Sequence, residues 1–221
     1  MKRVALILAL AFLLVPTVAL GDTVLDFNLP GGAGSISYEV GGPLVGSGIP
    51  VAYVVGYGTP QHAGYESRLV LANGVFNFST GPLTSSTVDL WYFGGGPDSY
   101  ITIYEGSEVW MEGLFGNATV LALRDESGVF TDFRVTASSF SDYKMGDLLT
   151  YFGLTEYVAP FTWAGNFSIN FRAEDTPPNG FASTWVGSGN VENTVPEPGT
   201  LALLGTGLIG IAGLIRRKLA I

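Results

Sequence analysis

Apolar and polar residues alternate with a period of two through most of the stretch between residues 22 and 194. In TVLDFNL, Leu25, Phe27 and Leu29 fall on one face and polar residues on the other, which is typical of a half-buried strand. Similar runs are SISYEV, RLVLANGVFNF, TVDLWYF, YITIYE, TVLALR, VFTDFRVTA, NFSINFR and FASTWVGSG. About ten to twelve such runs, separated by turn residues, predict an all-β body: an antiparallel β-sandwich, jelly-roll-like in type.

Two local signals refine this prediction. Asn73-Gly74 lies between two alternating runs and predicts a type I′ hairpin turn, because both residues adopt positive φ angles readily. Residues 141–153, SDYKMGDLLTYFG, predict a short helix with Ser141 as its N-cap. That helix would be an excursion between strands and not a second domain.

Residues 1–21 have the pattern of a secretory signal peptide, which forms a helix. Two cations precede an apolar run over residues 4–15, and Ala19-Leu20-Gly21 supplies the small residues that signal peptidase needs. Cleavage after Gly21 leaves Asp22 as the new N-terminus. An uncleaved anchor is the alternative, but the run is shorter than the roughly 17–25 residues of a membrane span. The expected partners of this segment are the Sec translocon and signal peptidase.

The body between the two end segments is acidic and lacks cysteine. Residues 22–194 hold five Lys+Arg and eighteen Asp+Glu, a net charge of −13. Without a basic cluster, binding to nucleic acid is not expected. With no cysteine and a single histidine, His62, neither a thiolate nor a multi-histidine metal site can form in one chain. We therefore expect no cofactor and no metal site.

Carboxylates offer the main candidate for catalysis. Glu108 and Glu112 flank Trp110, and in a regular strand all three would share one face, as a glycoside hydrolase requires of its two acids. The alternative is a solvated strand face. RDESG and AEDTPPNG contain oxygen ligands suited to calcium, but neither has the spacing of an EF-hand loop. We expect a protein that is not an enzyme.

Aromatic residues are the most prominent group in the body. Exposed aromatic rings on a β-sheet can stack on sugar rings, whereas buried ones fill a core that has no disulfides. Alternation in TVDLWYF places Trp91 and Phe93 on the face opposite Leu90 and Tyr92. The candidates for glycan stacking are the four tryptophans, Trp91, Trp110, Trp163 and Trp185.

The last 27 residues, 195–221, have three parts. The Pro-Glu-Pro at 196–198 is expected to be extended, because proline fixes φ and lacks an amide hydrogen. Residues 199–215 carry no charge and would form a transmembrane helix of about 25 Å. Three cations follow: Arg216, Arg217 and Lys218. By the positive-inside rule they stay in the cytoplasm, so the precursor is anchored in the inner membrane with its body outside.

This tail resembles the PEP-CTERM sorting signal of Gram-negative bacteria. The resemblance rests on Pro196, Glu197 and Pro198, on the Gly-rich apolar run, and on the terminal cations. It implies that exosortase, an integral-membrane cysteine protease, recognises the tail and cuts near the Pro-Glu-Pro. It also implies an association with exopolysaccharide, biofilm or floc. A permanent membrane anchor is the competing interpretation.

Together these features predict a three-part chain: signal peptide 1–21, β-sandwich domain 22–194 and sorting signal 195–221. The expected function is a structural protein of the cell surface or of an exopolysaccharide matrix, exported and processed by an exosortase. The alternative is a carbohydrate-binding module that contacts extracellular polysaccharide, and a glycoside hydrolase is less favoured.

Overall fold

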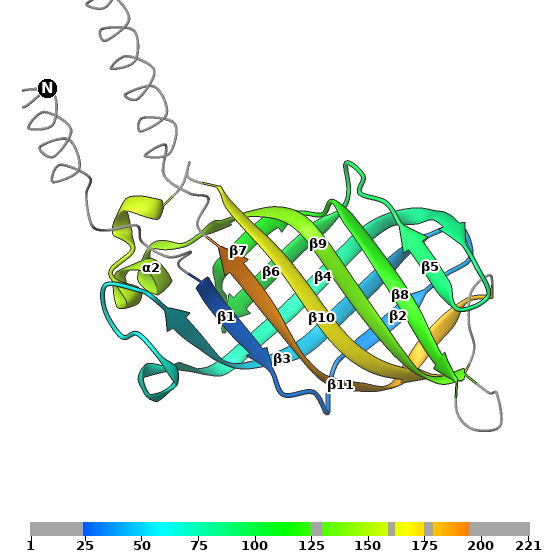
Figure 1. Cartoon of the computed structure of the whole chain (residues 1–221), viewed down its shortest axis with the longest axis horizontal. Helices are drawn as coiled ribbons and strands as arrows, with labels where there is room; N and C mark the ends of the chain where they lie inside the picture. The colour runs from blue at the N-terminus through cyan, green and yellow to red at the C-terminus, as the bar shows by residue number, and fades with distance from the viewer. Residues whose placement is uncertain (1–23, 125–129, 159–161, 175–178, 195–221) are drawn as a thin grey trace, which may run out of the picture.

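The computed structural model describes residues 24–124, 130–158, 162–174 and 179–194, and most of them form β-strands (Figure 1). All strand pairs in these ranges are antiparallel. The all-β prediction is therefore confirmed. The strands are β1 (Val24–Leu29), β2 (Ser35–Tyr38), β3 (Pro43–Tyr57), β4 (Leu69–Ser86), β5 (Leu90–Phe93), β6 (Tyr100–Glu105), β7 (Glu108–Leu114), β8 (Asn117–Arg124), β9 (Phe130–Lys144), β10 (Trp163–Ala173) and β11 (Phe181–Thr194).

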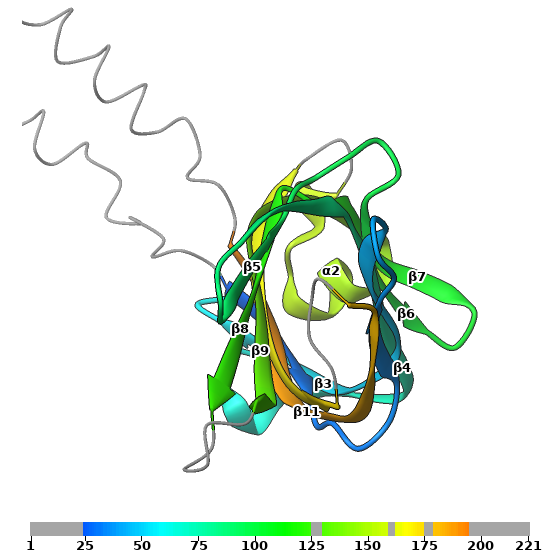
Figure 2. The ribbon, with the colours of Figure 1, turned by 90° about the vertical axis from the view of Figure 1, so that its right-hand side faces the viewer.

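These strands form a single sheet that closes on itself. β1 pairs with both β3 and β11, so the circuit β1-β3-β4-β6-β7-β9-β10-β11 is unbroken. Towards the other end, β2 bridges β11 and β3, while β5 and β8 bridge β4 and β9. Figure 2 shows the resulting cylinder of strands. Closure pairs the strand edges that an open sheet would leave exposed.

The sandwich and jelly-roll arrangement is consequently not confirmed. A sandwich needs two stacked sheets, whereas β3, β4, β9, β10 and β11 belong to one continuous sheet here. Alternation of apolar and polar residues cannot separate these folds, because each strand of either fold has one buried face. Register shifts between β3 and β4, β9 and β10, and β10 and β11 bend the long strands and allow the sheet to curve.

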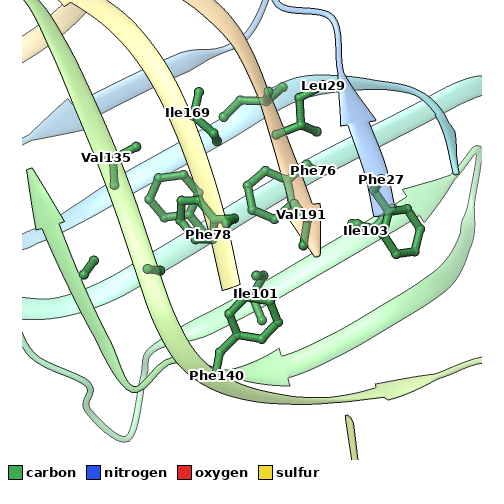
Figure 3. Packing of buried hydrophobic residues seen from close by; sticks show 14 of the residues in the cluster. Phe27, Leu29, Phe76, Phe78, Ile101, Ile103, Val135, Phe140, Ile169 and Val191 are labelled. Atoms are coloured by element: carbon green, nitrogen blue, oxygen red, sulfur yellow. The ribbon is translucent and has the colours of Figure 1, made fainter. Parts of the chain in front are cut away.

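Phenylalanine rings fill much of the interior of the cylinder (Figure 3). Phe167 of β10 lies near their centre and is 1% exposed. Its ring centroid is 4.9 Å from that of Phe78, 5.3 Å from that of Phe76 and 5.5 Å from that of Phe115. Phe76 and Phe115 meet it edge to face, the geometry that aromatic pairs prefer. A core of this kind stabilises the fold without disulfides.

One short helix, α2 (Gly146–Phe152), packs into the cylinder, where Figure 2 shows it within the outline of the strands. Leu148, Leu149 and Phe152 of this helix are fully buried. The helix ends at Gly153, whose φ of 71° lies in the left-handed region that favours glycine. The helix prediction is thus confirmed, but it began too early, since residues 141–144 belong to β9. Two 3-10 turns, η1 (Tyr65–Ser67) and η2 (Thr155–Tyr157), lie in connecting segments.

The hairpin turn predicted at Asn73-Gly74 is wrong. β4 runs without interruption from Leu69 to Ser86, and Gly74 pairs with Val51 on one side and Glu105 on the other. Within the described ranges Asn73 is not among the residues with positive φ. Gly74 is instead required by close approach, because a Cβ there would collide with the carbonyl oxygen of Val51.

The first and last strands of the sheet lie side by side. Val24 of β1 pairs with Thr194 of β11, so the body begins and ends at adjacent positions. Within the described residues, no helix has both the length and the apolar character needed to cross a membrane. The predicted signal peptide (1–21) and transmembrane segment (199–215) lie outside the described residues.

Candidate functional site

The four tryptophans occupy different environments. Trp91 and Trp163 are 1% and 0% exposed, so neither indole face can reach a sugar ring. Trp110 is half-buried and packs against the core. Trp185 on β11 is 46% exposed. Of the four stacking candidates, Trp185 presents the most accessible ring.

Trp185 belongs to a row of side chains that crosses the outer face of the sheet, here called the outer row. The row comprises Leu123, Asp132, Arg172 and Trp185, which pair in sequence across β8, β9, β10 and β11. The guanidinium carbon of Arg172 lies 5.4 Å from the centroid of the Trp185 ring, a cation–π contact. Arg172 Nε also donates a hydrogen bond of 2.8 Å to Asp132 Oδ1. That bond holds the pKa of the Asp132 carboxyl below its usual range.

The glutamates of the hydrolase hypothesis lie on the β6–β7 hairpin. Glu108 pairs with Glu105, and Glu112 pairs with Thr102 of β6 and Tyr143 of β9. A register shift at Ile103/Tyr104 adds an extra residue to β7, which breaks the alternation on which a common face for Glu108 and Glu112 depended. Glu105 accepts hydrogen bonds from the backbone amides of residues 72 and 73. Its carboxylate is therefore engaged in holding β4.

His62 contacts α2 from an exposed loop. Its ring stacks on that of Tyr151 with centroids 4.0 Å apart, and its Nδ1 lies 2.6 Å from the Tyr151 carbonyl oxygen. His62 has a positive φ of 51°, so the surrounding contacts hold its backbone in an unfavourable region. These contacts attach the loop to the helix. Among the residues that the structure describes, no group of three or more His, Asp or Glu could hold a metal ion.

A polar cluster lies inside the cylinder, here called the buried triad: Asp142, Lys144 and Asn193. All three side chains are 0% exposed. Lys144 Nζ donates to Asp142 Oδ1, and Asn193 Nδ2 donates to Asp142 Oδ2 over 2.5 Å. Asn193 Oδ1 is buried without a hydrogen-bond partner. Burial lowers the pKa of Lys144 to about 8 and raises the pKa of Asp142, in each case by disfavouring the charged form.

Sequence reasoning missed the buried triad for a definable reason. Phe133, Val135 and Ala137 point inward, so uninterrupted alternation would also turn Tyr143 inward and Lys144 outward. A register shift at Gly165/Asn166 of β10 changes the pairing on β9 from Ser138 to Phe140. From Phe140 onward, the residues of β9 that would have pointed outward therefore point inward. The helix predicted over residues 141–153 hid the same positions. The only signal in the sequence was that Phe140, Asp142 and Lys144 are spaced by two residues. This spacing places both charged residues on the same strand face as an apolar residue.

Another polar group lies where β1, β10 and β11 meet. Asp26 pairs with Glu192, which pairs in turn with Asn166. Asn190 Nδ2 donates a 2.7 Å hydrogen bond to Glu192 Oε1. Burial and the adjacent Glu192 raise the pKa of Asp26, although Asn190 opposes this change.

The end of β11 connects the body to the C-terminal tail. Thr194 pairs with Val24 on one edge and with Ala164 on the other, so the strand is bonded on both sides up to its last residue. Residues 194–218 match the family model described as the PEP-CTERM protein-sorting motif. The chain carries a PEP-CTERM sorting motif. This motif indicates an exported protein that is sorted and processed by exosortase, a membrane protease.

The PEP-CTERM match includes the tail residues that sequence reasoning selected. Pro196, Glu197, Pro198, Arg216, Arg217 and Lys218 all fall between residues 194 and 218. They lie outside the described residues, as do Ala19, Gly21 and Asp22 at the predicted signal-peptide cleavage site. Comparisons of the chain with curated proteins and with solved structures found no match.

Proposed function

We propose that the closed sheet is a non-catalytic structural component of the cell surface or of its polysaccharide matrix. The observation that carries this proposal is the PEP-CTERM motif, which starts at the last residue of β11. The motif directs export and sorting, and the closed sheet is the stable folded domain that is exported. Exopolysaccharide or biofilm matrix is the setting that the resemblance of the tail implies.

Side chains of the described body support a non-catalytic role through the contacts they already make. The His62 ring is stacked on Tyr151 with its Nδ1 at a backbone carbonyl. The Glu105 carboxylate accepts backbone amides of β4. Asp132 is paired with Arg172. In each case the group that could act in catalysis stabilises a local element instead.

In the proposed route, the signal peptide is removed between Gly21 and Asp22. The segment 199–215 then holds the precursor in the inner membrane, with the three terminal cations on the cytoplasmic side. Pro196, Glu197 and Pro198 form the recognition element, since prolines keep a short stretch extended and unpaired for a protease cleft. Cleavage near this element releases the body or transfers it to the outside.

The route is tested by replacing the Pro-Glu-Pro at 196–198 with three alanines. The variant should accumulate as a full-length species in the membrane fraction, while the parent is shortened and leaves that fraction. Glu108→Ala is the matched control, because it removes one exposed carboxylate from the body and leaves the tail intact. Equal release of the triple-alanine variant and the parent would contradict exosortase recognition at this element.

The non-catalytic assignment is tested on the released protein recovered from culture medium. Incubation with a panel of bacterial polysaccharides should leave their chain lengths unchanged. Hydrolysis that is reproducible and is lost in Glu108→Gln or Glu112→Gln would overturn the structural role and favour a glycoside hydrolase.

The second candidate is a carbohydrate-binding module, favoured by the exposed ring of Trp185. The 5.4 Å contact with Arg172 fixes one face of the indole, and apolar Leu123 lies at the far end of the same outer row. Affinity electrophoresis in gels containing extracellular polysaccharide should show retardation that Trp185→Ala abolishes. The control is Val40→Ala, at another exposed apolar position. Equal mobility of the parent with and without polysaccharide would contradict this candidate.

A further inference from the structure

Lys144 is the only lysine between residues 22 and 194, and it is fully buried. Lysine is rarely buried without a specific partner, because removing an ammonium group from water is expensive. Its Nζ lies 5.2 Å from the centroid of the Trp163 ring and 6.0 Å from that of Phe27. Two aromatic rings therefore lie close to this primary amine.

Asp142 brings this amine together with a carboxamide. One oxygen of its carboxyl group contacts Lys144 Nζ, and the other accepts a hydrogen bond from Asn193 Nδ2. The amine and the carboxamide come from β9 and β11, which are separated in the sheet by β10. Two glycines leave the space that these side chains occupy. A Cβ at Gly165 would collide with Asn193 Nδ2, and a Cβ at Gly113 would collide with Asp142.

We propose that Lys144 and Asn193 form an intramolecular isopeptide bond, with Asp142 as the catalytic residue. This covalent crosslink goes beyond the proposed function and does not depend on it. The required groups are an amine, a carboxamide and a shared carboxyl group, held together where water is excluded. The buried triad supplies all three.

The reaction balances without any further reagent. Proton transfer from Lys144 to Asp142 gives a neutral amine and a neutral carboxyl group. The amine attacks Asn193 Cγ as Asp142 donates its proton to Oδ1, and the Nζ–Cγ bond forms. Asp142 then takes a proton from Nζ and passes it to Nδ2. As the Cγ–Nδ2 bond breaks, the proton on Oδ1 returns to Asp142, the carbonyl group re-forms, and ammonia leaves. The net change converts an amine and a primary amide into a secondary amide and ammonia.

The environment favours each requirement of this reaction. Burial favours the neutral pair, in keeping with a lowered pKa for Lys144 and a raised pKa for Asp142. Asn193 Oδ1 has no hydrogen-bond partner. The carboxamide of Asn193 can therefore rotate by half a turn, which brings Oδ1 towards the proton on Asp142, and Oδ1 loses no hydrogen bond in doing so. The product removes a buried charge pair, which is an expensive arrangement in a dry interior.

The crosslink would join β9 to β11 across β10. Asn193 immediately precedes Thr194, where the PEP-CTERM motif begins. A pulling force applied at the C-terminal end of the body would then reach a covalent bond after Thr194, before it loads the hydrogen bonds of the rest of β11. A protein held at a surface through this end would gain resistance to mechanical unfolding.

The mass of tryptic peptides from the released wild-type protein decides the proposal. The protein is denatured and digested, with cleavage sites at Arg134, Lys144 and Arg172. The expected product is branched: residues 135–172, uncleaved at Lys144, joined to the peptide that starts at residue 173 and contains Asn193. Its mass equals the sum of the two peptides less one ammonia, and Lys144 resists amine-reactive reagents after denaturation.

Two results would overturn the proposal. One is cleavage after Lys144 with full amine labelling, which would identify the buried triad as a noncovalent cluster. The other is loss of one water within residues 135–172, which would place the bond between Lys144 and Asp142. Because the wild-type protein is measured, the decision does not depend on the folding of a variant.

Variants then test the role of each group. Lys144→Arg keeps a cation beside Asp142 but removes the nucleophile, so the branched peptide should disappear. Asp142→Asn keeps both reacting groups, and the crosslinked fraction should fall by at least about tenfold. Asp132→Asn, a control on the same strand with a side chain that is 47% exposed, should crosslink like the parent. Unchanged crosslinking in a folded Asp142→Asn protein would overturn the assignment of Asp142.

Discussion

Replacing Phe167 with alanine tests whether the aromatic interior stabilises the closed sheet. Phe167 is 1% exposed, and three ring centroids lie 4.9 to 5.5 Å from its own. Truncation of a fully buried phenylalanine lowers the free energy of unfolding by about 3–5 kcal/mol, because contacts are lost and a cavity remains. Against a typical total of about 5–15 kcal/mol, this is a large fraction of the stability of the domain.

The assay is urea denaturation of the released protein, followed by the fluorescence of buried Trp91 and Trp163. The control is Tyr92→Ala on β5, where a ring that is 39% exposed is removed from the outer face. The control should lower the free energy of unfolding by less than about 1 kcal/mol. A Phe167→Ala loss as small as that of the control, with an unchanged slope against urea, would refute the assignment of the core.

Three further perturbations test other parts of the structure. Asp26→Asn should raise the thermal midpoint at pH 7, because burial and Glu192 raise the pKa of Asp26 and ionisation at neutral pH therefore destabilises the folded state. The gain should vanish as the pH falls below the ordinary carboxyl pKa, since both states then keep the proton; a gain that persists in acid would contradict this cause. His62→Ala should lower the free energy of unfolding by about 1 kcal/mol and speed hydrogen exchange at the Gln61 amide, which donates to Phe152; unchanged exchange would show that the loop does not need the histidine. Lys144→Arg should lower the free energy of unfolding by about 4 kcal/mol relative to the crosslinked parent, the loop-closure value for a loop of about 50 residues, and equal urea midpoints would contradict a crosslink.

Period-two alternation predicted most of the strands but not their arrangement. Runs such as TVLDFNL and YITIYE coincide with β1 and β6, because one buried face is a local property of a strand. Trp91 and Phe93 lie on the face opposite Tyr92, as alternation in β5 predicted, but alternation did not indicate which of the two faces is buried. Closure of the sheet depends on β1 meeting both β3 and β11, a nonlocal property that no single run contains.

Failures of the sequence prediction occur where β-bulges or close packing override a local signal. Asn73-Gly74 has the composition of a tight turn, yet Gly74 lies within β4, at a position where the carbonyl oxygen of Val51 leaves no room for a side chain. The exchange of faces along β9 follows from a register shift, and it carries Asp142 and Lys144 into the interior. Neither effect can be derived from residue type alone.

The candidate sites differ in whether their residues are close together or far apart in the sequence. The sorting motif was predictable because its recognition resides in one continuous stretch, which residues 194–218 match. The outer row and the buried triad each join strands that are distant in sequence. Asp132 lies forty residues before Arg172, and Asp142 lies 51 residues before Asn193. Only the pairing of β9, β10 and β11 brings these residues together.

The most direct test of the whole account is terminal sequencing, by mass spectrometry, of the protein found outside the host cells. We expect a body that begins at Asp22 and ends near Pro196-Glu197-Pro198, without residues 199–221. Recovery of the intact chain from the soluble cytoplasmic fraction, with both terminal segments still attached, would contradict it.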